Sequence, residues 1–125
     1  MAADRQLGSL ASLNDPWQPA VLQLISATVA GAARATALDP AAGARTVGVC
    51  GEAAADPALA VVLAGMGVNT LSMTPRALSS VGAVMASVTL DQAKERSARA
   101  LAAHSATEAR TIVRSRLPIL EQLGL

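Results

Sequence analysis

The sequence predicts an α/β fold, and two observations carry that prediction. Two short runs rich in β-branched or apolar residues, 46–50 and 69–73, each precede a proline-led helix start and an apolar helical segment. This strand–helix–strand–helix order is typical of parallel strands joined by right-handed connections. The last third of the chain has no strand pattern and predicts helices alone.

The chain opens with a segment, 1–16, whose glycine, serine and Asn14-Asp15-Pro16 residues favour turns. From Pro19 onward, apolar residues recur at helical spacing, and a proline suits the first helical turn. We therefore predict a helix over about 17–35. Asp39-Pro40 and Gly43 then predict a loop.

The first βα unit begins with a predicted buried strand at 46–50, which Gly51 ends. Asp56 and Pro57 have the residue types of an N-cap and a first helical turn, so a helix is expected there. Leu59 to Met66 continue that helix, and Gly67 is expected to end it.

The second unit repeats this order in shorter form. A second strand is predicted at 69–73, with Thr74 as N-cap, Pro75 in the first turn and a helix over 76–86. In the tail, Thr89 with Gln92 and Ser105 with Glu108 have capping-box spacing. These pairs predict helices at about 90–103 and 106–123. The mostly basic charges between 94 and 116 favour a solvated helix face over a binding patch.

A pair of strands is small for a sheet. Parallel pairs normally belong to larger sheets covered on both faces. Either the helices of this chain bury the pair alone, or the strands belong to a sheet that other segments complete.

Composition limits the size of the core. The chain has 125 residues and is 52% hydrophobic, but 29 of its 65 apolar residues are alanine, Phe and Tyr are absent, and Trp occurs once. Since alanine buries only one methyl group, a full self-sufficient core is doubtful.

Charge and cysteine content exclude several classes of protein. A net charge of +1 without stacking aromatic residues disfavours nucleic-acid binding. One cysteine allows no internal disulfide, and no charged leader precedes an apolar run. The uncharged stretches 16–33, 57–75 and 77–90 are interrupted by polar residues or are short, so no membrane insertion is predicted.

Candidate functional residues are few. Cys50 and Glu52 would lie at the carboxyl end of a parallel strand, where α/β folds bind ligands; a small buried thiol is an equally weighted interpretation of Cys50. Arg5 could bind a phosphate or carboxylate, although a solvated arginine is the commoner case. His104 lacks relay partners, so no catalytic role is expected. Gly65-Met66-Gly67 indicates a helix stop, since no phosphate-loop or zinc spacing is present.

A family resemblance rests on four blocks that occur in order. They are Met1-Ala2-Ala3-Asp4-Arg5, Asp15-Pro16 with Pro19-Ala20-Val21-Leu22, Gly48-Val49-Cys50-Gly51-Glu52-Ala53-Ala54-Ala55-Asp56, and Leu63-Ala64-Gly65-Met66-Gly67-Val68 with Leu71-Ser72-Met73. In these blocks the chain resembles the end of enzyme I of the bacterial sugar phosphotransferase system, the phosphoenolpyruvate-protein phosphotransferase.

The resemblance implies a partial (βα)8 TIM barrel over 1–88 and a helical tail over 89–125. A whole barrel needs ~250 residues, so 125 is about half of one. In this family the barrel binds phosphoenolpyruvate and magnesium, and phosphoryl passes to a histidine of a separate N-terminal domain and then to the phosphocarrier protein HPr. The resemblance further implies a cytoplasmic homo-oligomer serving sugar transport.

The resemblance also assigns two residues. Cys50 matches the family's proton donor to the enolate carbon, a role that suits a thiol because thiols are mostly protonated at neutral pH. Arg5 matches an arginine that contacts the phosphate of phosphoenolpyruvate. Leu7 departs from the Asn that the family often has there.

The magnesium ligands, the other phosphate-binding arginines and the phosphorylated histidine are expected outside these 125 residues. No turnover is therefore predicted for this chain alone. The alternatives are a non-catalytic assembly module built on a half barrel and, less favoured, a redox role for Cys50, which lacks a resolving cysteine.

Overall fold

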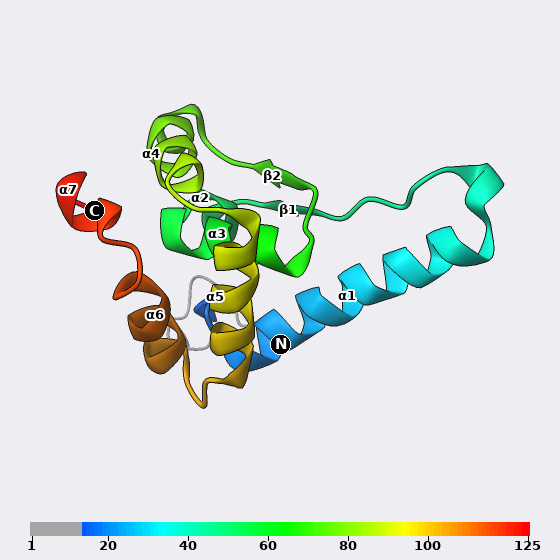
Figure 1. Cartoon of the computed structure of the whole chain (residues 1–125), viewed down its shortest axis with the longest axis horizontal. Helices are drawn as coiled ribbons and strands as arrows, with labels where there is room; N and C mark the ends of the chain where they lie inside the picture. Colours follow the sequence, from blue (N-terminus) through cyan, green and yellow to red (C-terminus); the bar gives the residue numbers. More distant parts are fainter. Residues whose placement is uncertain (1–13) are drawn as a thin grey trace.

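The computed structural model describes residues 14–125, and Arg5 therefore lies outside the described residues. The described part has a central helix packed among other helices, a long helix that projects from them and a two-stranded sheet (Figure 1). The elements in chain order are α1 (Pro19–Leu38), η2 (Pro40–Ala42), β1 (Gly48–Cys50), α2 (Glu52–Ala55), α3 (Pro57–Met66), β2 (Thr70–Ser72), α4 (Pro75–Ala86), α5 (Leu90–Ala102), α6 (Ala106–Arg114) and α7 (Ile119–Gln122).

The two strands pair in parallel, as the sequence predicts, with Val49 opposite Leu71 and Cys50 opposite Ser72. Both strands are shorter than predicted. Val47 donates its N–H to Oδ1 of Asn69 at 2.9 Å, and Asn69 donates its own N–H to the carbonyl of Val47 at 2.9 Å. Because a side chain takes part in these contacts, the regular ladder starts one residue later.

The faces of this sheet differ. Val49 and Leu71 are half-buried and pack against the core. The opposite face carries the small residues Gly48, Cys50, Thr70 and Ser72, all of them exposed. The described helices therefore do not bury the pair on both sides, which counts against the first of the two alternatives.

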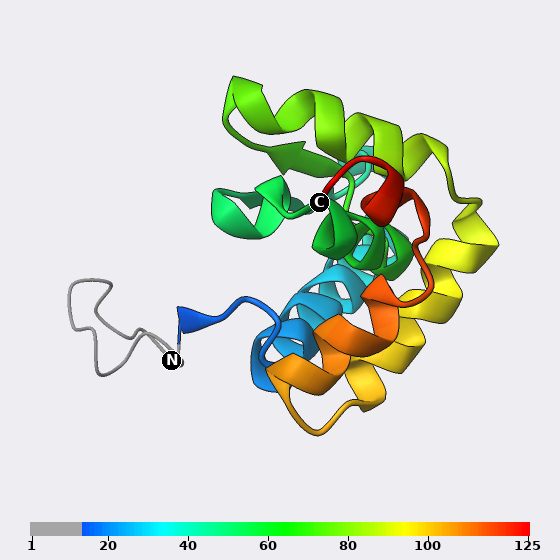
Figure 2. The same ribbon diagram turned by 90° about the vertical axis from the view of Figure 1, so that its left-hand side faces the viewer.

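Helix α3 forms the centre of the core. Ala58 to Leu63 are all fully buried, as expected for a helix that is apolar on every side. It packs against α4, α5 and α6, and Figure 2 shows it enclosed among them. Asp56 caps its first turn by accepting the N–H groups of Ala58 and Leu59, and Gly67 ends it with a φ of 100°. Both predicted boundaries are confirmed.

Helix α1 extends away from the rest of the molecule (Figure 1). Among its residues only Leu22 is buried, while Leu24 and Leu38 are exposed. It is the one helix of the described chain long and apolar enough to cross a bilayer by length and composition, criteria that core helices also meet. Within residues 14–125, then, most of the apolar surface of α1 has no covering element.

The tail contains three helices where the sequence analysis predicts two. The predicted continuous helix over 106–123 is wrong: α6 ends at Arg114, and α7 begins after Pro118. Proline has no N–H to donate and crowds the carbonyl four residues earlier, so the helix stops before it. The chain turns at 115–118 and buries Leu117 and Leu120.

The remaining caps differ in detail from the prediction. Thr89 and Gln92 form the full predicted capping box. Ser105 accepts the N–H of Glu108, but the carboxylate of Glu108 accepts the N–H of His104 instead of completing the box. Thr74 makes no side-chain cap hydrogen bond, so its predicted capping role is wrong. The short helix α2 was not predicted.

Candidate functional site

The candidate site lies where the two strands end, and we call it the Cys50 edge. It consists of Cys50 at the end of β1, the following Gly51 and Glu52, and Ser72 at the end of β2. The parallel register brings Cys50 opposite Ser72. The Cys50 thiol is free and exposed, so the interpretation as a small buried thiol is wrong for this chain. Exposure at the carboxyl ends of parallel strands is the placement expected of a reactive side chain in an α/β fold.

Backbone geometry fixes the turn that follows the thiol. Gly51 has a φ of 79° and a ψ of −148°, a conformation that is essentially restricted to glycine. Its N–H donates to the carbonyl of Ser72 at 3.0 Å, which closes the end of the sheet. Glu52 begins α2, so the chain reverses immediately after Cys50 and leaves the thiol at the outermost position of the strand.

The segment before α1 is tied to the segment after this edge by Trp17. Its ring is fully buried, and its Nε1 donates to Oδ2 of Asp56 at 2.8 Å. The other carboxylate oxygen of Asp56 caps α3. Arg110 of α6 lies over the ring, 5.8 Å from its centroid, and donates to both oxygens of Asp15 at 2.7 and 2.8 Å. The segment before α1, the start of α3 and the helix α6 therefore meet at Trp17.

Sequence reasoning missed this cluster. The Trp17–Asp56 bond spans 39 positions and the Arg110–Asp15 pair spans 95. Asp56 could be identified only as an N-cap from its neighbours. The available signal was only general: a buried indole N–H needs an acceptor, and no local pattern identifies Asp56 as that acceptor.

We expect Asp56→Ala to lower the free energy of unfolding by about 2–3 kcal/mol, since it removes a helix cap and leaves a buried indole N–H without an acceptor. Circular dichroism during urea unfolding measures the loss. In a Trp17→Phe background there is no indole N–H to lose its acceptor, so Asp56→Ala should lower the free energy of unfolding by only about 1 kcal/mol. Equal costs in the two backgrounds would show that the Trp17–Asp56 bond contributes nothing.

The other sequence candidates lie away from the Cys50 edge. His104 is exposed between α5 and α6. Gly65-Met66-Gly67 is the end of α3, as predicted. Among residues 14–125 no three His, Cys, Asp or Glu side chains are grouped to hold a metal ion.

The basic residues of the tail are mostly engaged in structural contacts. Arg110 pairs with Asp15, and Arg99 pairs with Glu95 one turn away on α5. The hydrogen bond from Arg99 holds the pKa of the Glu95 carboxyl below its ordinary value. This arrangement agrees with the favoured interpretation of a helix surface rather than a polyanion-binding patch.

The chain matches known proteins along most of its length. A family model described as "PEP-utilising enzyme, PEP-binding domain" matches residues 1–90. The phosphoenolpyruvate-protein phosphotransferase of Streptomyces coelicolor is 51% identical over 110 residues, which are 88% of this chain and 18% of that protein. The multiphosphoryl transfer protein of Xanthomonas campestris is 38% identical over 112 residues, 90% of this chain and 12% of that protein.

A third relative is the phosphoenolpyruvate-protein phosphotransferase of Haloferax volcanii, 35% identical over 113 residues, which are 90% of this chain and 19% of that protein. The chain thus spans less than a fifth of the length of these curated relatives. The family model covers most of the chain, including Cys50 and both strands. The chain therefore belongs to the family of phosphoenolpyruvate-binding domains of phosphoenolpyruvate-utilising enzymes, and its resemblance to enzyme I of the phosphotransferase system is confirmed.

Proposed function

We propose that this chain supplies part of a (βα)8 barrel that binds phosphoenolpyruvate and passes its phosphoryl group to a protein histidine. The observation that carries the proposal is the exposed thiol of Cys50 at the end of a parallel strand, within the residues that the family model matches. The uncovered small-residue face of the sheet would then point into the barrel, and the uncovered surface of α1 would pack on neighbouring barrel helices.

The proposed reaction transfers a phosphoryl group and leaves an enolate to be protonated. The bond between the phosphorus and the enol oxygen breaks, the phosphoryl group goes to a histidine nitrogen, and the electron pair stays on the oxygen as an enolate. The enolate carbon C3 then takes the proton of Cys50, which gives pyruvate and a thiolate that solvent reprotonates. Arg5, which lies outside the described residues, would hold the phosphate with its planar donor fork.

Magnesium is a further expectation of the family. The described residues offer no group of three acidic, histidine or cysteine ligands, so they do not fit such a centre by themselves, and no step here depends on the ion. In the proposal the metal ligands, the acceptor histidine and the surface that meets HPr lie in other segments of the protein. The 125 residues alone should then release no pyruvate, because positioning groups act only when assembled.

A chimera tests the proposal. Residues 1–125 replace the matching segment of the Streptomyces coelicolor relative, and pyruvate release from phosphoenolpyruvate is measured with HPr present. We expect turnover by the chimera and background rates from the 125-residue chain. An inactive chimera that nevertheless folds and binds phosphoenolpyruvate would contradict the proposal, and so would enzyme-like turnover by the chain alone.

A second candidate function is a non-catalytic assembly module, which the uncovered faces of the sheet and of α1 favour. Such apolar helix surface is expected to pair with a second copy when no barrel covers it. Light scattering behind size exclusion should then give a dimer mass at micromolar concentration. A stable monomer would count against this candidate and leave the proposed barrel as the explanation of those faces.

A further inference from the structure

Arg96 of α5 is a nearly buried cation with no carboxylate at salt-bridge distance in the described chain, although its charge helps to hold the pKa of Glu95 below its ordinary value. Only 9% of the residue is exposed. Its Nη2 donates to the carbonyl of Arg116 at 2.7 Å, while its Nε has no hydrogen-bond partner. The ion pairs of residues 14–125 use Arg99, Arg110 and Arg116 instead.

Burying a guanidinium that has an N–H without an acceptor costs free energy. It carries five N–H donors, and arginine is almost never buried unless it is paired. The Nη2 hydrogen bond and the nearby charge of Glu95 offset part of the lost hydration, but the buried Nε–H has no acceptor. The helix α5 forms despite this cost, which points to an anion that completes the site.

The structure has a pocket for such an anion beside Arg96. A hollow of about 470 Å³ lies between the end of α4, the α5 helix and the segment that carries Pro118. Arg96, Arg116 and Gln92, which carry N–H donors, are among its lining residues, and the lining includes no acidic side chain. Gln92 uses its amide oxygen in the capping box, so the NH₂ group is the half that remains for a ligand. We call this hollow the Arg96 pocket.

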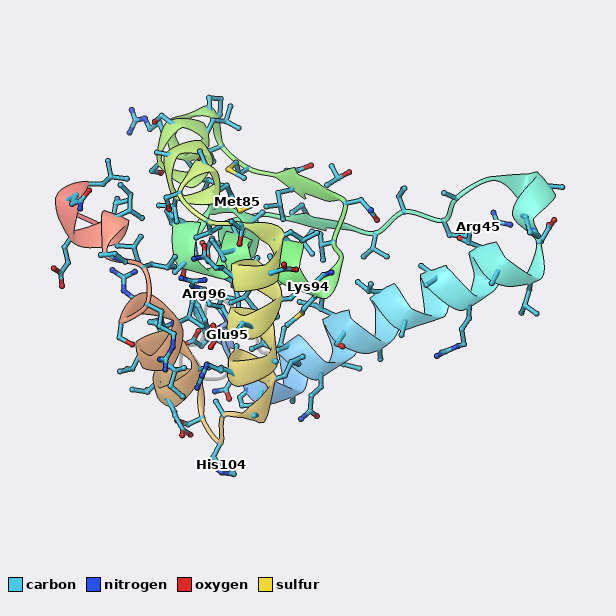
Figure 3. All side chains as sticks on the ribbon, in the orientation of Figure 1. Arg45, Met85, Lys94, Glu95, Arg96 and His104 are labelled. Atoms are coloured by element: carbon cyan, nitrogen blue, oxygen red, sulfur yellow. The ribbon has the colours of Figure 1, made fainter. Side chains whose placement is uncertain are left out.

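The pocket is not simply polar. Val88, Leu117 and Ile119 also line it and form an apolar wall. Figure 3 shows Arg96 on the side of α5 that faces α6, whereas Lys94 extends from the opposite side of the same helix. Arg96 therefore lines the pocket, whereas Lys94 of the same helix does not.

We propose that the Arg96 pocket binds a small organic carboxylate with a short aliphatic tail. A carboxylate matches the planar fork of a guanidinium, and an aliphatic tail fits the wall of Val88, Leu117 and Ile119. Inorganic phosphate would satisfy the charge but would leave that wall facing water. Neither Cys50 nor Ser72 lines the pocket, so this site is independent of the proposed phosphoryl transfer.

Nuclear magnetic resonance on the ¹⁵N-labelled 125-residue chain tests the site with 3-methylbutanoate as probe. The Nε–H signal of Arg96 is assigned by its loss in Arg96→Lys. It should shift to saturation with a dissociation constant on the order of 1 mM. Backbone signals around Leu117 should saturate at the same constant. Inorganic phosphate should bind at least tenfold more weakly.

Two variants complete the experiment. Arg96→Lys keeps the charge without the fork and should weaken probe binding at Leu117 about tenfold. Lys94→Met removes a charge two residues away and should leave binding unchanged. Emission of the buried Trp17 confirms that both variants fold. A linear, unsaturated shift, equal binding by Arg96→Lys, or tighter binding of phosphate would overturn the proposal. A chemical shift that changes with protein concentration when no probe is present would also overturn it, because a carboxylate from a second copy of the chain would then occupy the pocket.

Discussion

Cys50→Ser in the chimera is expected to lower pyruvate release by about 10²- to 10⁴-fold, the usual contribution of a general acid. Serine matches cysteine in shape, but its hydroxyl is a far weaker acid than a thiol and cannot protonate carbon effectively. The enolate then persists and takes the phosphoryl group back. Phosphorylation of the acceptor histidine should therefore fall together with pyruvate release, and both are measurable in the same reaction.

A relocated thiol provides the matched control for this prediction. Ser79 is exposed within the helix α4 and does not lie at a strand end, so Cys50→Ser combined with Ser79→Cys keeps one accessible thiol per chain. In the proposed mechanism only a thiol at the strand end reaches the enolate, so the double variant should remain as slow as Cys50→Ser. Pyruvate release within twofold of the parent in Cys50→Ser would remove Cys50 from the mechanism.

Local chemistry explains why much of this fold follows from the sequence. Asp56-Pro57 starts α3, Gly67 ends it, and Thr89 with Gln92 starts α5, as predicted. Each of these boundaries depends on hydrogen bonds within four residues of the chain, so residue types at fixed spacing are sufficient evidence. The parallel pairing followed from the strand–helix–strand order. The barrel itself stays a prediction, since two strands do not close one.

Apart from the short helix α2 and the absent Thr74 cap, the features that were missed depend on contacts between distant segments, with one exception. No local pattern indicates that Trp17 meets Asp56, or that Arg96 is buried beside the carbonyl of Arg116. Pro118 is the exception, because a proline within a helical pattern is itself a signal for a break. At the Cys50 edge the sequence placed the thiol correctly, but only the structure shows that it is exposed.

In the Gly65-Met66-Gly67 motif, one glycine has a local role and the other a tertiary one. Replacement of Gly65 by alanine should have the largest effect on stability. The sequence pattern Gly65-Met66-Gly67 predicts a helix stop, and Gly67 alone ends α3. Gly65 is instead the point where α3 contacts α5. A Cβ there would lie well inside 3.0 Å of both the Ala93 carbonyl and the Ser97 hydroxyl. The Ser97 hydroxyl also donates to the carbonyl of Val62 on α3.

We therefore expect Gly65→Ala to lower the free energy of unfolding by about 3 kcal/mol or more, because α3 and α5 must separate and the Ser97 bond must break. Urea unfolding followed by emission of Trp17 measures the loss. Gly82→Ala is the matched control: Gly82 also lies within a helix, and a Cβ there meets nothing within 4 Å. It should raise stability by about 0.5–1 kcal/mol through helix propensity. Gly65→Ala as stable as Gly82→Ala would mean that α3 and α5 do not approach closely at Gly65.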